Sequence, residues 1–344
     1  MKTIRTALVG YGYWGANLGR NIEAAAGLDL VHVVDGSADR RRLALDRHAS
    51  VAVHAELGPV LEDRTIDAIA LATPAGSHAA LARMALDSGR HVFVEKPLAT
   101  NVVDATDLRD RAAEAALTLM VGHTFLYSSP VRWLKQAIEA GELGAINYVY
   151  SQRLNLGRIR SDCNALWNFG PHDVSILRYL LDERPVEVSA TGFSFLQKGI
   201  DDVCFATLRF PSGAAASLHV SWIDPRKTRL MTVVGDRQMA VYDDVSPDSK
   251  IWMYDAGAVP ALDATFGEFG SLGDFEWRTR AGDVRLPQIA MKEPLLVEME
   301  AFALACATGI PPLTDAEHGL EVVRVLCAIE ESAGLRGCPV GIEW

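Results

Sequence analysis

Three glycines and a later aspartate have the residue types and the spacing of a nucleotide-binding turn. Gly10, Gly12 and Gly15 follow an apolar run, and Asp35 ends a second apolar run twenty residues after Gly15. Such glycines allow a tight turn from strand to helix and let a pyrophosphate approach the backbone at the helix N-terminus. The pattern is a dinucleotide-binding fingerprint, and it predicts a protein that works with NAD or NADP.

The residues beside Asp35 bear on the choice between these two cofactors. An acidic side chain at this position accepts hydrogen bonds from ribose hydroxyls and repels a 2′-phosphate, which favours NAD. Ser37 and Arg40, the first of three consecutive arginines, leave room for NADP. We therefore expect NAD, with NADP as the alternative. The expected cofactor-binding set also includes Tyr13, Trp14 and Gly36.

Lys96 is the first candidate for a catalytic residue. It lies between Glu95 and Pro97, directly after an apolar run whose carboxyl end would lie at the edge of a parallel sheet where ligands bind. Its ammonium could stabilise a developing alkoxide there, and Pro97 would constrain the turn, with a cis Lys96–Pro97 bond as one option. The alternative is an ordinary surface lysine at a strand end.

A second catalytic segment spans residues 166–173. Pro171 fits only the first turn of a helix, so Asn168 is a plausible N-cap and His172 lies one turn further on the same face. An imidazole near a helix N-terminus favours its neutral form, which suits a general base that takes a proton from a hydroxyl. The alternative is a structural histidine. Asp173 points about 100° away around the helix and is expected to serve structure.

A basic loop precedes this segment. Arg153, Arg158 and Arg160 lie close together with Asn155 and Asn164 in an otherwise acidic chain. Guanidinium groups suit carboxylates and phosphates, so the loop indicates an anionic substrate; a solvated or salt-bridged loop is the alternative. His123 and Tyr127 follow the last strand of the first domain and are further candidates for the same pocket. A role in the core or at an interface is equally open for each.

Alternation of apolar runs with helical stretches predicts the elements that position these residues. The runs at 4–9, 30–34, 68–72, 91–94 and 117–121 predict a Rossmann-type doubly wound parallel sheet in a domain of residues 1–122. The fold class is α/β in this part, and a second domain, residues 123–344, is expected to be α+β.

The second domain is expected to contain a large, mostly antiparallel, open-faced sheet. Strand patterns follow one another almost without helices, with a hairpin turn at 211–213, and residues 255–282 are expected to form an ordered excursion or an interface loop. The expected strands are 146–153, 186–196, 203–210, 214–222, 229–235 and 238–242. The expected helices are 130–140, 171–181, 294–308 and 315–334, and packing of the last two on the first domain is left open.

Composition limits the classes of partner. The 344 residues, 49% of them hydrophobic, are enough for two cores, and a net charge of −11 without a basic aromatic stretch gives no support for nucleic-acid or membrane binding. No signal-peptide or membrane-spanning pattern is present, so we expect a cytoplasmic protein. The five cysteines and nine histidines show no ligand spacing, so we expect no metal and no disulfide.

Taken together, these motifs resemble those of a known enzyme family. Gly10 to Gly15, the Ala72-Thr73-Pro74 segment, His78, Glu95-Lys96-Pro97 and the helix with His172 occur at the spacing of the Gfo/Idh/MocA oxidoreductase family, which the chain resembles over essentially its whole length. The resemblance implies hydride exchange between a nicotinamide and a carbon bearing a hydroxyl or ketone, usually on a sugar or polyol. It also implies that Thr73, Pro74 and His78 line the cofactor cleft and that Glu95 and Lys96 reach the nicotinamide side.

The chain departs from the family at Asn168, where many members have Asp. An Asp/His pair would share the proton-transfer role, whereas an amide can orient a partner but cannot act as a base at neutral pH.

Within the family, the arginine-rich loop resembles the subgroup that acts on nucleotide-linked sugars, including uronic acids oxidised at C3. Arg158 or Arg160 would then meet a carboxylate or a diphosphate. A free-sugar or inositol dehydrogenase is the enzymatic alternative, and a non-catalytic sensor of NAD(P) and sugar is the alternative of another class. Because the family commonly covers its open sheet by pairing subunits, we expect a homodimer or homotetramer.

Overall fold

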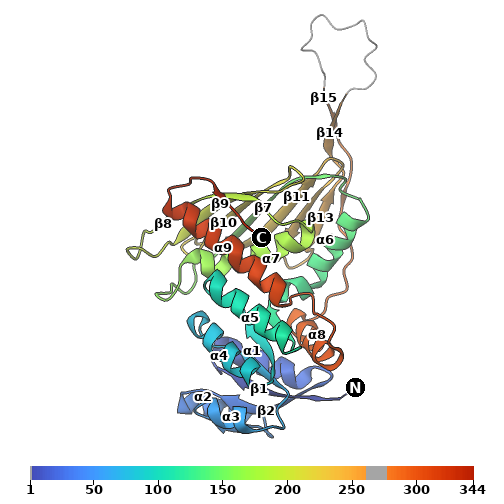
Figure 1. The fold of residues 1–344 in the computed structure, drawn as a ribbon. Coiled ribbons are helices and arrows are strands. Elements are labelled where there is room, and N and C mark those ends of the chain that lie inside the picture. Colours follow the sequence, from blue (N-terminus) through green and yellow to red (C-terminus); the bar gives the residue numbers. More distant parts are fainter. Residues whose placement is uncertain (1, 261–276) are drawn as a thin grey trace, which may run out of the picture.

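A parallel sheet forms the first part of the chain in the computed structural model, which describes residues 2–260 and 277–344 (Figure 1). Its strand order is β3-β2-β1-β4-β5-β6, and every neighbouring pair is parallel. The elements are β1 (Ile4–Val9), α1 (Tyr13–Ala24), β2 (Leu28–Val34), α2 (Ala38–Arg47), β3 (Ala52–His54), α3 (Gly58–Glu62), β4 (Ala68–Leu71), the 3-10 turn η1 (Ala75–Ser77), α4 (His78–Asp87), β5 (His91–Glu95), α5 (Val102–Glu114) and β6 (Leu119–Gly122).

The strand order places the glycine turn at the point where ligands bind in such sheets. β1 lies between β2 and β4, so the chain reverses its direction of travel across the sheet at β1. In open α/β sheets the crevice at such a switch point, outside the carboxyl ends of the strands, receives the ligand. The expected Rossmann-type architecture is confirmed.

A larger mixed sheet forms the second part. Its order is β16-β13-β12-β11-β7-β10-β9-β8-β17, and all its neighbouring pairs are antiparallel except β7 and β10. The elements are η2 (Thr124–Tyr127), α6 (Ser129–Glu139), β7 (Ile146–Leu154), α7 (Ala165–Leu181), β8 (Glu187–Phe193), β9 (Val203–Arg209), β10 (Ala215–Ser221), β11 (Thr228–Gly235), β12 (Met239–Asp243), β13 (Ile251–Tyr254), β14 (Gly257–Pro260), β15 (Trp277–Arg280), β16 (Val284–Arg285), α8 (Pro294–Thr308), α9 (Ala316–Gly334) and β17 (Val340–Gly341).

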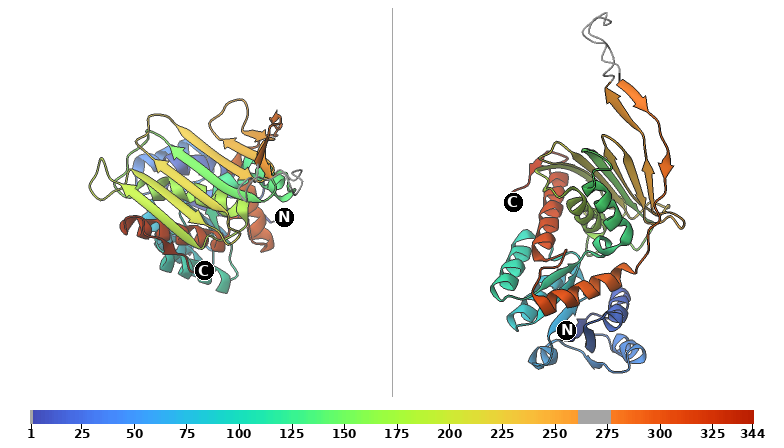
Figure 2. Two further views of the ribbon diagram at one scale, coloured as in Figure 1. Left: turned by 90° about the horizontal axis from the view of Figure 1, so that it is seen from above. Right: turned by 90° about the vertical axis from the view of Figure 1, so that its right-hand side faces the viewer.

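Helices cover one face of this sheet and leave the other open. α6, α7 and α9 pack below it, whereas the view from above shows the strands with no helix over them (Figure 2, left). In β9 the side chains alternate between buried and exposed, as expected of a strand with one covered face. The exposed side carries aromatic residues, with Tyr148 stacked on Tyr150 and Phe205 stacked on His219.

The last two helices return to the parallel sheet (Figure 2, right). α8 contacts α1, β1 and β2, and its Phe302 packs edge-on against Phe93 of β5 with ring centroids 5.8 Å apart. α9 contacts α5 and β6 on one side and α7 and β8 on the other. The two parts of the chain therefore share helices that come late in the sequence.

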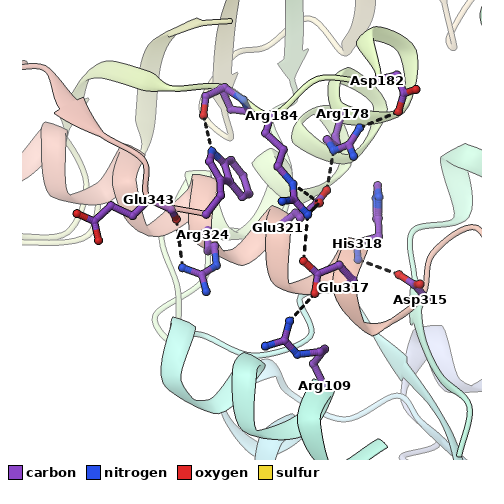
Figure 3. Close-up of polar contacts among 12 residues, drawn as sticks. Arg109, Arg178, Asp182, Arg184, Asp315, Glu317, His318, Glu321, Arg324 and Glu343 are labelled. Atoms are coloured by element: carbon purple, nitrogen blue, oxygen red, sulfur yellow. Dashed lines mark hydrogen bonds and ion pairs between the residues drawn. The ribbon is translucent and has the colours of Figure 1, made fainter. Parts of the chain in front are cut away.

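A network of ion pairs fastens α9 to both parts (Figure 3). Arg109 of α5 and Arg184 both contact Glu317, while Arg178 of α7 and Arg184 both contact the buried Glu321. One turn separates the two glutamates, so one face of α9 binds arginines from α5, from α7 and from the segment after α7.

The local patterns predicted most elements to within a few residues, and two differences matter. α7 begins at Ala165 instead of Pro171, and the short strands β3 and β13 to β17 were not predicted. The excursion expected at 255–282 lies in part outside the described residues, because it includes 261–276. The hairpin turn at 211–213 is confirmed, with Gly213 at φ +90° between β9 and β10. None of the helices in the described ranges is long and apolar enough to cross a membrane.

Candidate active site

The turn after β1 requires its glycines. Gly10 has φ +90°, and a Cβ there would lie 2.7 Å from the Ala72 carbonyl oxygen; a Cβ at Gly15 would lie 2.0 Å from the oxygen of Gly10. Gly12, by contrast, has only the Arg40 guanidinium within 4 Å of such an atom. The turn is therefore closed toward the protein and open above Gly12, where α1 begins and its free N–H groups attract phosphate. These residues fit NAD.

The carboxylate of Asp35, the predicted ribose ligand, is held in place by two backbone amides. The amides of Tyr11 and Ser37 donate to its two carboxylate oxygens at 2.7 and 2.8 Å, and Arg40 lies 3.5 Å from Oδ2. Arg41 instead donates to the carbonyl oxygens of Asp35 and Gly36. Of these two arginines, only Arg40 faces both the acid and the glycine turn.

His78 joins the loops after β4 and β5 instead of lining an open cleft. Its Nδ1 lies 2.8 Å from the Pro97 carbonyl oxygen and its Nε2 lies 2.9 Å from that of Thr73, and the ring is buried. Burial lowers the pKa of His78, so the neutral ring donates to one of the two carbonyls. Ser77 donates to the Thr73 hydroxyl, and Pro74 precedes η1. The contribution of His78 is thus to the position of the Glu95-Lys96-Pro97 loop.

Lys96 connects the two parts of the chain. Its Nζ donates to the backbone oxygen of Asn168, in α7, at 3.1 Å, and the Lys96–Pro97 bond is cis. Burial lowers the pKa of Lys96; Arg160 and Arg153 lower it further, whereas Glu95 opposes the shift. The adjacent Glu95 accepts a hydrogen bond from the indole of Trp14, and burial raises its pKa to about 7.

The prediction that Asn168 caps the helix is wrong. Asn164 is the N-cap of α7, because its side chain accepts from the amide of Trp167 at 3.0 Å, and Pro171 lies inside the helix. Pro171 has no N–H for the carbonyl of residue 167, so the helical bonding is interrupted beside the carbonyl of Asn168 that accepts from Lys96. Asn168 meets Lys96 through its backbone.

His172 is neutral for a reason other than the predicted one. It is the eighth residue of α7, too far from the N-terminus for the helix dipole to act on it. Burial, and then the charges of Lys96 and Arg153, lower its pKa well below the usual value. Within the described residues its Nδ1 is buried without a hydrogen-bond partner, and the ring packs edge-on against Phe125 at 5.0 Å. A neutral imidazole with free bonding capacity suits a base.

Arg153 is engaged by the protein itself. It lies in β7, and its guanidinium makes two 2.9 Å bonds to the carboxylate of Asp173, both side chains being buried. Asp173 thus has the structural role expected of it. Arg153 also lies 4.6 Å from the ring centre of Phe125. Arg153 was predicted to bind substrate. In the structure its charge is already paired with Asp173, close to His172, so it is not a free ligand for an anion.

Sequence reasoning missed Arg229 and Phe125. Arg229 of β11 lies 5.9 Å from the same Phe125 ring and pairs with Asp244 at 2.9 Å. Arg229 is far from His172 in the sequence, so no local pattern could connect the two residues. The pairing of β11 with β7 brings Arg229 close to Phe125.

The remaining loop residues divide into engaged and exposed groups. Arg160 pairs with Asp162 through hydrogen bonds of 2.9 and 2.6 Å. The side chain of Asn164 caps α7 and donates a hydrogen bond to Glu330. Arg158 is exposed, and across the described ranges it has no ion-pair partner; Asn155, nearby, is partly buried. Of the predicted anion ligands in this loop, Arg158 is the available charge.

His123 and Tyr127 lie in the interior. The Tyr127 hydroxyl bonds to that of Thr314 at 3.1 Å, which is the core role left open from the sequence. His123 is buried edge-on against His318, and in the described part of the chain neither of its ring nitrogens has a partner. Burial, then His318 and Lys96, lower its pKa well below the usual value. Among the described residues, no group of three His, Cys, Asp or Glu side chains could hold a metal ion.

Fold and site define a dinucleotide-dependent oxidoreductase with two sheets. Residues 4–123 match an oxidoreductase family with an NAD-binding Rossmann fold, and residues 131–241 match the GFO/IDH/MocA C-terminal domain. The chain belongs to the Gfo/Idh/MocA oxidoreductase family, whose cofactor is a nicotinamide dinucleotide.

Three relatives illustrate the range of names in this family. The UDP-N-acetylglucosamine 3-dehydrogenase of Acidithiobacillus ferrooxidans is 27% identical over 327 residues, covering 94% of this chain and 95% of that one; its structure has a TM-score of 0.80 at 24% identity, covering 97% and 99% of the two chains. The D-xylose 1-dehydrogenase (NADP(+)) 2 of Haloferax volcanii is 30% identical over 286 residues, 80% of each chain. The 2,7-anhydro-N-acetylneuraminate hydratase of Mediterraneibacter gnavus is 28% identical over 236 residues, 64% of this chain and only 62% of its own length.

Proposed function

We propose that the protein is an NAD-dependent dehydrogenase that oxidises a secondary alcohol of a nucleotide-linked sugar, or reduces the corresponding ketone. The observation that carries the proposal is the contact of Lys96, at the end of a strand of the parallel sheet, with α7, which holds a neutral His172. The exposed Arg158 lies in the loop that leads into this helix. The similarity to a UDP-sugar dehydrogenase over nearly the whole chain supports the same class of substrate.

In this mechanism the chain's own residues handle the proton and the charge. NAD, when bound by the glycine turn and Asp35, supplies the acceptor for a hydride. His172 takes the proton of the substrate hydroxyl, since burial keeps its imidazole neutral at physiological pH. Lys96 stabilises the negative charge that develops on the substrate oxygen, and Arg153, paired with Asp173, keeps His172 from gaining a proton prematurely.

The position of Asn168 fits a supporting role. Its carbonyl fixes the Lys96 ammonium, and its side chain, four residues before His172, lies on the same face of α7. It therefore positions Lys96, and the amide is available to a substrate hydroxyl. An aspartate at this position would add a negative charge beside Lys96, which the amide avoids.

The arginine loop supplies the argument for a nucleotide. Arg158 has no ion-pair partner among the described residues, and a diphosphate or carboxylate of the substrate could pair with its guanidinium group. A free sugar offers no such anion. The match to a D-xylose dehydrogenase keeps the free-sugar dehydrogenase as the second candidate, and a non-catalytic sensor is the third.

The test is turnover followed by cofactor fluorescence. Purified protein is mixed with UDP- and dTDP-sugars, including uronic acids, and with free sugars and inositols, using NAD+, NADP+ and both reduced forms. We expect turnover with a nucleotide-linked sugar and NAD. We expect Arg158→Ala to raise KM by about tenfold, one lost charged contact, and the exposed Arg64→Ala to leave it unchanged. Turnover of free sugars alone would establish the second candidate, and cofactor binding without turnover on the whole panel would favour the sensor.

We also propose that the open face of the large sheet is covered by a second copy of the chain. The face presents the aromatic residues Tyr148, Tyr150, Phe193 and Phe205. A contiguous apolar surface of this kind marks an interaction site, and a two-fold axis through a sheet buries the same face of both subunits.

A further inference from the structure

A second buried carboxyl group lies near the site, and the proposed mechanism does not use it. Glu298 is on α8, and its side chain is fully buried. Its Oε2 accepts a hydrogen bond from the Thr124 hydroxyl at 2.7 Å, whereas Oε1 has no partner within the described residues. An ionised carboxylate in these surroundings would be strongly destabilised, so Glu298 is held neutral.

Glu95 and Glu298 converge on the end of β6. A Cβ added at Gly122 would lie 3.1 Å from each carboxyl oxygen of Glu95, and Thr124, which binds Glu298, is two residues further on. The Trp14 indole donates a hydrogen bond to the Glu95 side chain. Across the described part of the chain, neither carboxyl group forms an ion pair with Arg or Lys. One elementary charge brought to this place would therefore decide how many protons the pair holds.

Among the residues that the structure describes, three other titratable groups lie near the pair. Lys96 follows Glu95 in the chain, and Tyr127 of η2 lies near Glu298. His123 lies in the sequence between Gly122, which contacts Glu95, and Thr124, which binds Glu298. Burial, and then the proximity of Glu95, raise the pKa of Glu298 well above its usual value, while burial raises that of Glu95 to about 7. Glu95 therefore loses its proton first, and Glu298 is still protonated when it does.

The nicotinamide ring brings such a charge in only one of its two forms. Trp14 lies in the first turn of α1, next to the open backbone above Gly12, and it ties Glu95 to the cofactor side of the sheet. The oxidised ring is a cation and the reduced ring is neutral. We propose that Glu95, beside the protonated Glu298, senses the charge of the nicotinamide ring: NAD+ binding releases its proton to solvent, and NADH binding does not.

This inference rests on the cofactor of the family and not on the proposed sugar substrate. If NAD+ prefers ionised Glu95, NAD+ must bind more tightly as pH rises toward the pKa of free Glu95 and reach a constant affinity above it. The gain is at most about tenfold per pH unit. NADH and ADP-ribose, which lack the ring charge, should show no such dependence.

The experiment is calorimetric titration of the full chain with NAD+, NADH and ADP-ribose, without substrate, in buffers of different ionisation enthalpy. We expect NAD+ to release close to one proton at about pH 6, about half a proton at pH 7 and almost none at about pH 8.5. NADH and ADP-ribose should release none. Glu95→Gln keeps an acceptor for Trp14 and should abolish the proton release, and ADP-ribose binding verifies that the variant is folded.

Two further variants assign the proton. Glu298→Gln replaces a neutral acid with a neutral amide and should preserve the release, as should Glu300→Gln, which removes an exposed carboxylate from the same helix. Release that survives Glu95→Gln, release that disappears in Glu298→Gln, or equal release with NAD+ and NADH would each overturn the inference. Because no sugar is present, a failed substrate panel leaves this result unaffected, and a failed titration leaves the substrate panel unaffected.

Discussion

Burial acts on the two nitrogen groups of the site in the same direction but with different consequences. It lowers the pKa of Lys96 and that of His172, and the charge of Lys96 lowers the pKa of His172 further. For His172 the shift removes the charge at neutral pH, since its usual pKa is already near 6.5. Lys96 starts four units higher, from 10.5, and has Glu95 beside it. In the proposed mechanism His172 is therefore the base and Lys96 is the cation that stabilises the oxyanion.

Removing the Lys96 ammonium should affect the reaction and not cofactor binding. We expect Lys96→Ala to lower kcat by about 10²- to 10³-fold, because the developing oxyanion loses its charged partner. NAD affinity, measured by quenching of tryptophan fluorescence, should change little. A variant with wild-type kcat would remove Lys96 from the chemistry, and loss of NAD affinity instead of kcat would make it a cofactor ligand.

The pH dependence of the reaction should reveal His172. Its folded-state pKa lies well below 6.5, so the base is free over the whole neutral range, and kcat for alcohol oxidation should not fall as pH is lowered through 6.5. We expect His172→Ala to lower kcat by about 10²- to 10⁴-fold. Stopped-flow or steady-state rates from acid to alkaline pH provide the measurement. Equal rates of wild type and variant at every pH would exclude His172 as the proton-transfer group.

At the scale of elements, the start of α7 decides where Asn168 and His172 lie. The Asn164 cap satisfies an amide that would otherwise lack a partner, and Pro171 stays inside the helix because its surroundings are buried. A proline in the interior bends a helix and frees the carbonyl four residues before it, which here is that of Trp167. Next to this interruption, in the first turn of α7, the carbonyl oxygen of Asn168 accepts from Lys96.

The cap provides a stability prediction. Asn164→Ala should lower the free energy of unfolding by about 1 kcal/mol, since the Trp167 amide loses its acceptor. Asn164→Ser, which keeps an acceptor oxygen and places no second carboxylate against Glu330, should retain most of the stability, while Asn168→Ala should not show the loss expected of a cap. Urea denaturation followed by circular dichroism measures all three. If Asn168→Ala proved the more destabilising of the two alanine variants, the assignment of the cap would be wrong.

The same helix shows how far sequence reasoning reaches. Gly10 to Gly15 and α8 could be predicted, because a fingerprint and a long apolar pattern are local signals. Pro171 misled the prediction of α7, because the rule that places proline in a first turn ignores the packing that holds it in the interior. β16 and β17, of two residues each, have too few positions to show a period. Arg229 and Glu298 reach the site only through strand pairing and the return of α8.

At the scale of the molecule, the open face of the large sheet is the clearest surface for association. Phe205 lies on this face, stacked on His219 and edge-on to Phe193. We expect the wild type to be a dimer or tetramer and Phe205→Glu to shift it toward the monomer, because a charge would be buried in the interface. Light scattering after size exclusion, with Leu45→Glu on the exposed face of α2 as control, measures this. A wild type that is monomeric at micromolar concentration would refute the expectation.

The return of α8 and α9 to the parallel sheet also has a consequence for how the protein is made. Phe302, which packs on Phe93, leaves the ribosome about 200 residues later, which is roughly 10 to 40 s at ordinary rates of synthesis. During that interval the nascent Rossmann sheet has an uncovered apolar flank beside β1, β2 and α1. We therefore expect this part of the nascent chain to expose apolar surface to chaperones until α8 is made, and slow codons before residue 294 to prolong that exposure.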